Sequence, residues 1–542
     1  MEEFAQFLDD LLGGVDLVAY SVAVGGLIWG VVVLRGWWSR DEDIAPAVHG
    51  CLRLVVIGAL GLALSQGIGL AIKAWILAET LGRSPFPFLL YTTRFQAGLT
   101  QMLVAAGMAG VSVALWRRPR SRRRWLLALG LALILVVVAA WLTHAASRLD
   151  QRAWLMVLTS LHEVGAAIWV GGVIQIGAFW RLKRRRQALD ALWPVVLARF
   201  SSLGIVAVLL LAGVGTALAW SYIGSWRGLF GTAYGAIVVV KLVLFATALG
   251  FAALNRHAVG VWARTRDGGG LTRRVPYFVE AETILLVALL VTASALTSQP
   301  PAVDTVAETA SWAEFADVFT PRLPRISSPA HAAVVAADED ALGNPGTLSG
   351  APESWSEYNH NMAGLFLVIM AVGALANFGG RIPGARHWPL GFIALGVFLF
   401  MRSDPMSWPL GPIPFWSSLF DGTVLQHRLA TVLSFALGLF EWRARSPRVE
   451  DQSRRPYVFP LLCLAGGVLL LTHSHRDFVL KSEYLIQISH TAMGLLAILM
   501  ACGRWLELRL APPIGRVAGF GSIAAMASIG LILMFYQEPL AY

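Results

Sequence analysis

Residues 117–144 read RRPRSRRRWLLALGLALILVVVAAWLTH, and this stretch decides the fold class. An arginine-rich loop is followed by 20 residues, 125–144, that contain no acidic or basic residue other than a final histidine. A helix of about 20 apolar residues crosses the ~30 Å hydrocarbon core of a bilayer. Short arginine-rich loops stay on the cytoplasmic side during insertion. The stretch therefore predicts a membrane-spanning helix that starts in the cytoplasm and ends outside it at His144.

Apolar blocks of this kind recur along the whole chain. Hydrophobic residues make up 56% of the sequence and charged residues 14%, against about 25% charged in a typical soluble protein. We predict an all-α polytopic transmembrane bundle of about 14 spans, eight followed by six, because each block is about one bilayer thick. The predicted spans are 15–35, 52–77, 95–116, 125–144, 154–180, 199–221, 233–254, 278–298, 358–379, 386–402, 422–442, 456–473, 484–503 and 516–536.

Residues 299–357 differ in composition from the spans on either side. They are rich in proline, alanine, serine and acidic residues, which is typical of an extended or partly ordered linker. We therefore expect an N-terminal bundle at 1–298, a linker at 299–357 and a C-terminal bundle at 358–542. The arginine clusters lie in alternate loops, which places the N-terminus and the linker outside the cytoplasm.

The net charge of +10 also follows from these loops. Arginines beside spans contact anionic lipid head groups, so we expect membrane lipid and not nucleic acid as the partner. The three cysteines are far apart and form no CxxC pair, which argues against a disulfide framework and a thiolate metal domain.

Histidines gather at the outer ends of the predicted C-terminal spans. Imidazole suits copper, and thioether sulfur favours Cu(I). One such histidine alone would be interpreted as an interfacial anchor, but five on one leaflet predict a metal site. The proposed ligands are His360, His427, His473, His475 and His490, with Met362 assisting, and His144 and His162 of the first bundle lie toward the same side.

Two charged residues are predicted inside spans of the first bundle. Glu163 and Lys241 are costly in lipid unless they are paired or hydrated. An ion pair between them would relieve both costs. Such a pair could gate an ion path or relay a proton, and it could equally serve only to hold two helices together.

Haem b is the alternative cofactor to copper. Small residues follow several of the histidines one turn later, which lets a flat macrocycle approach the helix or lets two helices pack closely. The haem ligands would be His360, His427, His473 and His490. The crowding of these histidines on one face favours metal ions over a pair of stacked haems.

Several classes of protein are not indicated by the sequence. It has no GxxxxGK[ST] phosphate loop, no aspartyl-phosphate motif and no arrangement typical of a hydrolase. We expect no nucleotide, and a transporter or metal-binding protein in preference to an enzyme.

Three stretches resemble one known family. The segments LTSLHEVGAAIWVGGVIQIGAFW from Leu158, ARFSSLGIVAVLLLAGVGTALAW from Ala198 and GTAYGAIVVVKLVLFATALGFAALNRH from Gly231 are similar to the copper-resistance D (CopD) family of bacterial inner-membrane proteins, over about residues 150–298. The second part of the chain, from SEYNHNMAGLFLVIM at Ser356, looks like the C-terminal extension of longer members. The resemblance implies copper handling at the bacterial cytoplasmic membrane, as uptake from the periplasm.

Some members of that family also contain an extracytoplasmic copper-binding β-domain. None is recognised in this sequence, so we expect a separate periplasmic copper-binding donor protein. A copper-delivery factor for respiratory oxidase assembly would use the same ligands and stays open as an alternative.

Overall fold

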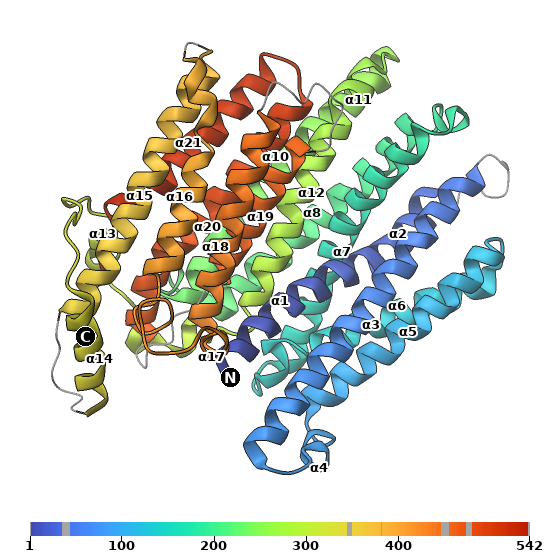
Figure 1. Ribbon diagram of the computed structural model, residues 1–542. Helices are drawn as coiled ribbons and strands as arrows, with labels where there is room; N and C mark the ends of the chain where they lie inside the picture. The colour runs from blue at the N-terminus through green and yellow to red at the C-terminus, as the bar shows by residue number, and fades with distance from the viewer. Residues whose placement is uncertain are drawn as a thin grey trace. The chain divides into compact units, whose positions relative to one another are not determined.

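The computed structural model describes residues 2–34, 44–343, 350–380, 382–445, 455–472 and 480–539, and its regular elements are all helices. Twelve of them are long and apolar enough to cross a membrane (Figure 1). This confirms the predicted all-α polytopic membrane fold. The twelve are Phe7–Leu34, Ala45–Leu81 (α3), Thr93–Arg117 (α5), Arg122–Ala140 (α6), Arg152–Lys183 (α7), Trp193–Ile223 (α8), Ala233–Thr265 (α10), Val275–Ala295 (α12), Ala351–Phe378 (α15), Gly422–Ala444 (α18), Leu480–Arg509 (α20) and Ile514–Met534 (α21).

Two further apolar helices are shorter. Leu390–Arg402 (α16) and the segment Arg455–Leu471, which ends in α19 (Val458–Leu471), lie where the sequence predicts two more spans. Thirteen residues of α-helix rise about 20 Å, less than the ~30 Å hydrocarbon core. The division into eight and six spans therefore stays a prediction.

The chain forms two compact units. The N-terminal unit comprises Leu8–Gly224 and Lys241–Val303, and α7 is its central helix, in contact with α3, α6, α8 and α12. The first span also packs on α7, and it consists of α1 (Glu2–Tyr20), the π-helical turns η1 (Ser21–Gly25) and η2 (Gly30–Leu34), and α2 (Gly26–Trp29) between them. Close contact is possible because Gly25 meets Ala167 and Gly171 across the interface.

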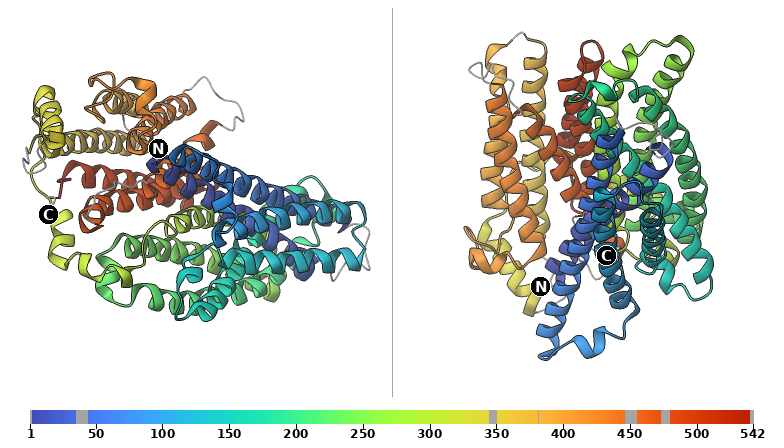
Figure 2. Two further views of the ribbon diagram at one scale, coloured as in Figure 1. Left: turned by 90° about the horizontal axis from the view of Figure 1, so that it is seen from below. Right: turned by 90° about the vertical axis from the view of Figure 1, so that its right-hand side faces the viewer.

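The C-terminal unit contains Ser225–Val240 and Asp304–Tyr542 together with the first seven residues. Its helices α15, α16, α18, α19, α20 and α21 each contact the next in order, and α21 contacts α15, so the six form a closed ring. They run side by side in Figure 1 and in the right-hand view of Figure 2, in yellow to red. Their shared core includes Met370, Phe392, Phe459 and Met493.

The predicted linker contains ordered elements in its described part. These are two short 3-10 turns (Ala302–Asp304 and Val306–Glu308), α13 (Trp312–Val318) and α14 (His331–Gly343). Ser311 and Glu314 form a capping box at the start of α13, and Lys481 of α20 pairs with Glu314. Within the C-terminal unit, this segment is thus fixed to the start of a span. The predicted domain limits at 298 and 357 are not tested by these contacts.

Candidate metal centre

Two of the predicted histidines meet in the C-terminal unit. His360 lies in the third turn of α15 and His490 in the third turn of α20, and their ring centroids are 5.6 Å apart. Tyr536, just after α21, stacks at 4.2 Å from the His360 ring and lies 6.4 Å from that of His490. The closed ring of helices brings these three rings together because α21 contacts both α15 and α20.

His427 is the third imidazole at this end of the unit. It lies in the second turn of α18, close enough to His490 to interact with it electrostatically. Its Nδ1 is 2.7 Å from Oδ1 of Asp404, which is almost fully buried. Burial acts to raise the pKa of Asp404, but hydrogen bonds from His427 and Ser403, with the positive charge of Arg428, outweigh it, so this pKa lies below its usual value. Asp404 is therefore an ionised partner that fixes the orientation of His427.

These three imidazoles share one tautomer. The Nδ1 of His360 is 2.9 Å from the carbonyl oxygen of Ser356, and that of His490 is 3.2 Å from the carbonyl oxygen of Ile486. A carbonyl or carboxylate oxygen only accepts, so Nδ1 donates in all three rings, including His427. The lone pair is then on Nε2, which is the arrangement that metal-binding histidines show when their other nitrogen donates to an oxygen.

A carboxyl group adjoins the His360–Tyr536 contact. Glu538 accepts hydrogen bonds from the hydroxyls of Ser356 and Tyr536. Burial raises the pKa of the Glu538 carboxyl above its usual value, against the effect of these two hydrogen bonds. Asp404, Tyr536 and Glu538 were not among the residues predicted from the sequence. The only local signal was the position of Asp404 and Glu538 next to the ends of spans.

The other predicted ligands are placed differently. His473 and His475 lie outside the described residues. Met362 follows His360 by two residues, which is about 200° around the helix, so the two side chains leave α15 on different faces. His144 donates from Nε2 to the carbonyl oxygen of Leu296 in the N-terminal unit, and so has the opposite tautomer. Among the described residues, no group of three or more His, Cys, Asp or Glu side chains is positioned to hold a metal ion.

The predicted intramembrane charges lie in the N-terminal unit. Among the ion pairs of the described residues there is none between Glu163 and Lys241. Instead, Lys241 interacts electrostatically with His162, and Glu163 interacts electrostatically with Tyr20 of the first span. His162 Nδ1, Glu163 Oε2 and Tyr20 Oη are all buried without a hydrogen-bond partner. The pairing of Glu163 with Lys241 remains a prediction that these contacts do not support.

The small residues after the histidines serve helix packing. A Cβ at Gly364 would lie 2.1 Å from the backbone nitrogen of Met534, and one at Gly494 would lie 2.9 Å from the carbonyl oxygen of Gly467. Helices α15 and α21, and α19 and α20, therefore touch at the positions where a macrocycle would need room. The haem alternative loses the clearance on which it was based.

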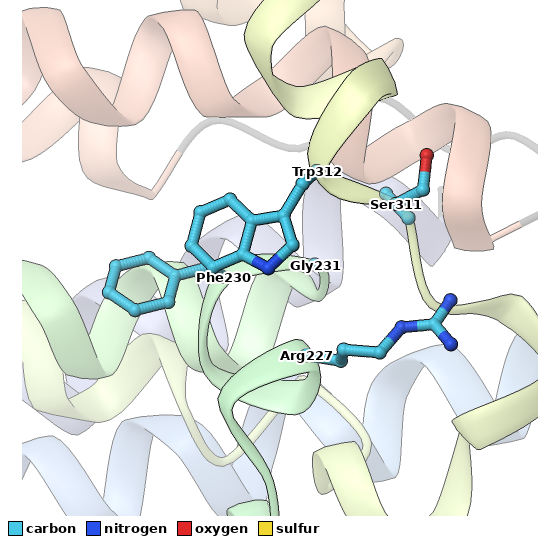
Figure 3. A pocket seen from close by; sticks show the side chains of 6 residues that line it. Arg227, Phe230, Gly231, Ser311 and Trp312 are labelled. Atoms are coloured by element: carbon cyan, nitrogen blue, oxygen red, sulfur yellow. The ribbon is translucent and has the colours of Figure 1, made fainter.

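A shallow pocket elsewhere in the C-terminal unit contains no histidine. It lies between the short helix α9 (Trp226–Phe230) and the start of α13, where Trp312 packs on Phe230 with ring centroids 5.1 Å apart. Figure 3 shows the indole beside the phenyl ring, with the Arg227 guanidinium directed away from both. It is lined by Arg227, Phe230, Gly231, Ala310, Ser311 and Trp312. None of these side chains is a typical copper ligand, so the pocket is separate from the imidazole group.

Comparison with known proteins agrees with this membrane fold and with copper. The family model described as copper resistance protein D matches residues 194–296. Over these residues the chain is similar to the copper-resistance D family. The copper transport protein CutJ of Bacillus subtilis (strain 168) is 27% identical over 283 residues, which are 51% of this chain and 50% of that protein. This match covers about half the length of that curated relative, and no solved structure matches the chain.

The predicted CopD resemblance is thereby confirmed, with a family match that starts later than the predicted residue 150. The chain has twelve helices long and apolar enough to cross a membrane among its described residues, and part of it is similar to a copper-resistance family. Helices α8, α10 and α12 contain the family-matched residues, whereas the imidazole group lies in the C-terminal unit and outside that match.

Proposed function

We propose that this protein binds copper at the imidazole group of its C-terminal unit and brings it into the cell across the bacterial cytoplasmic membrane. His360 and His490 are the first ligands, and His427 is the third donor. His473 and His475 are further proposed donors to the same ion. His144 and His162 of the N-terminal unit are proposed for a later step. Copper is the transported ion in this account.

The contact between His360 and His490 is the main support for this proposal. Two imidazoles that share an ion place their nitrogens at most about 4 Å apart, because each metal–nitrogen bond is about 2 Å. Ring centroids separated by 5.6 Å are compatible with that limit. The common tautomer places the lone pairs on Nε2, and Asp404 supports His427 as carboxylates support metal-binding histidines elsewhere.

The distribution of arginines supports an extracytoplasmic position for the imidazoles. Helices α18 and α20 begin at the histidine end, and they finish at Arg443 and Arg445 and at Arg504 and Arg509. Arginine-rich helix ends are retained in the cytoplasm. The histidine ends then face the periplasm, where a copper-binding donor protein would load the site. The membrane potential favours cation entry by about 2.3 kcal/mol per charge for each 100 mV.

Copper accumulation in cells tests this function. We expect the double variant His427→Ala/His490→Ala to accumulate much less copper than the wild type at equal membrane abundance. Uptake that stays at the wild-type level would rule out the imidazole group as the entry site. The matched control is His387→Ala, because His387 lies exposed before α16 and accepts a hydrogen bond from Trp442 near the end of α18.

The absorption spectrum of the same purified protein separates copper from the two alternatives. A Soret band that disappears in the histidine variants would favour the haem-binding redox protein. Co-purification with oxidase subunits, together with unchanged copper uptake, would favour the delivery factor. We expect neither result.

A further inference from the structure

A second polar group lies inside the N-terminal unit. Glu282 of α12 is 3% exposed. Its Oε1 accepts a hydrogen bond of 2.7 Å from the indole nitrogen of Trp169 on α7, and its Oε2 accepts one of 3.0 Å from the amide nitrogen of Asn255 on α10. Three spans of the unit thus meet at one carboxyl group. Glu282 and Asn255 belong to the family-matched region.

Among the described residues this carboxyl group takes part in hydrogen bonds but in no ion pair. Its side-chain hydrogen bonds come from Trp169 and Asn255. The charged residues on the surrounding helices are Arg152, Glu163, Arg181 and Lys183 on α7, Lys241, Arg256 and Arg264 on α10, Arg273 on the adjoining α11 (Gly269–Arg273) and Glu280 on α12. A carboxylate in a span is costly without such a partner, and a proton removes that cost.

Asn255 provides a second state for the same contact. Its amide nitrogen donates to Glu282, while its own oxygen, Oδ1, is buried without a hydrogen-bond partner. A half-turn of the amide group exchanges the two atoms. Oδ1 then accepts a hydrogen bond from a protonated Oε2, and Trp169 continues to donate to Oε1. Both protonation states of the carboxyl are therefore hydrogen-bonded in one unchanged backbone.

We propose that Glu282 is a reversible proton-binding site within the CopD-family bundle, with Asn255 as the amide that changes orientation as the proton binds. A proton from water bonds to Oε2 and the carboxylate becomes neutral. When the proton leaves, the amide nitrogen of Asn255 again donates to Oε2. A carboxyl that gains and loses a proton within the spans can couple proton movement to that of another cation. The inference does not depend on the copper ligands, which belong to the other unit.

Infrared difference spectroscopy of the metal-free full-length protein in lipid tests this site. We expect a carbonyl stretch of a protonated carboxylic acid to appear in acidic buffer and to disappear in alkaline buffer. Glu282→Gln should remove one component of that band, since other carboxyl groups of the chain also protonate in acid. Glu280→Gln is the matched control, two residues away on the same helix, and should retain it. A difference spectrum of Glu282→Gln that superimposes on that of the wild type would overturn the proposal.

A second variant keeps the test decisive if Glu282→Gln does not fold. Trp169→Phe removes one donor to the ionised carboxylate and therefore favours the protonated form. The band should persist to a pH about 1–2 units higher than in the wild type. An unshifted titration would show that Glu282 holds a single protonation state and serves only to connect helices. Because the protein is free of copper, neither outcome depends on the proposed copper uptake.

Discussion

The two units use polar side chains in opposite ways. The C-terminal unit gathers imidazoles within the first three turns of α15, α18 and α20, and Asp404 supports one of them. The N-terminal unit buries Glu282, Glu163 and Lys241 within its spans, and no ion pair of the described residues joins them. Ligands at helix ends suit the capture of a metal ion, whereas isolated carboxyls within spans suit protons.

Removal of the His360 and His490 imidazoles should have the largest effect, because it should reduce copper binding in one unit and leave the other unit unchanged. We expect His360→Ala/His490→Ala to weaken copper binding by more than about 100-fold, because even residues that only support a ligand account for 10- to 100-fold. Titration of the purified protein with a copper chelator measures it. Glu282→Gln in the other unit is the control and should bind copper as the wild type does. If both variants lost copper affinity to the same extent, copper would not be bound in the C-terminal unit alone.

Replacement of the residue that supports His427 should have the next largest effect. Asp404→Asn removes the carboxylate that accepts from Nδ1, and copper affinity should fall by about 10- to 100-fold while folding is retained. Asp421→Asn is the matched control, since Asp421 caps the start of α18 and has no contact with an imidazole in the described structure. If both variants bind copper equally, Asp404 serves the loop and not the metal site.

Close packing of the first span on α7 should be sensitive to a single methyl group. A Cβ at Gly171 would lie 2.2 Å from the carbonyl oxygen of Ser21, so Gly171→Ala should destabilise the N-terminal unit by about 1–3 kcal/mol. Gly177→Ala, six residues along α7, meets nothing within 4 Å and should be neutral. Thermal unfolding in detergent measures both. Copper affinity of the folded fraction should be unchanged, and a matching loss would show that the units are not independent.

The smallest effect is expected where the linker joins α20. The hydrogen bond from Lys481, with that from the Ser311 backbone, lowers the pKa of Glu314 from 4.5 to about 2. The stabilisation is therefore complete above about pH 4.5 and is lost as the pH falls toward 2. Glu314→Gln should speed proteolysis of the linker a few-fold at most, since exposed ion pairs contribute about 0.2–1 kcal/mol.

Asp317→Asn is the control for this variant, because Asp317 pairs with Arg322 inside the linker and not with a span. If Glu314→Gln and Asp317→Asn were cleaved by protease at the same rate at neutral pH, Glu314 would not fix α13 to α20.

The fold class was predictable because hydropathy and arginine loops are local signals. The positions of His360, His427 and His490 near the starts of spans followed from the same signals. Their partners did not, since Asp404 meets His427 across a loop and Glu538 meets Ser356 across 182 positions of sequence. Glu282 was missed because its significance depends on Trp169 and Asn255, which lie on two other helices. The Glu163–Lys241 pair was a reasonable prediction from charge alone, yet each residue interacts with a different neighbour.

Metal analysis and an absorption spectrum of one preparation test the copper site most directly. The full-length protein, purified in detergent after exposure to copper, should retain copper and show no Soret band. His360→Ala/His490→Ala should lose that copper, while His387→Ala should retain it. Copper that stays bound in the double variant would contradict the account, and so would a Soret band that the double variant loses.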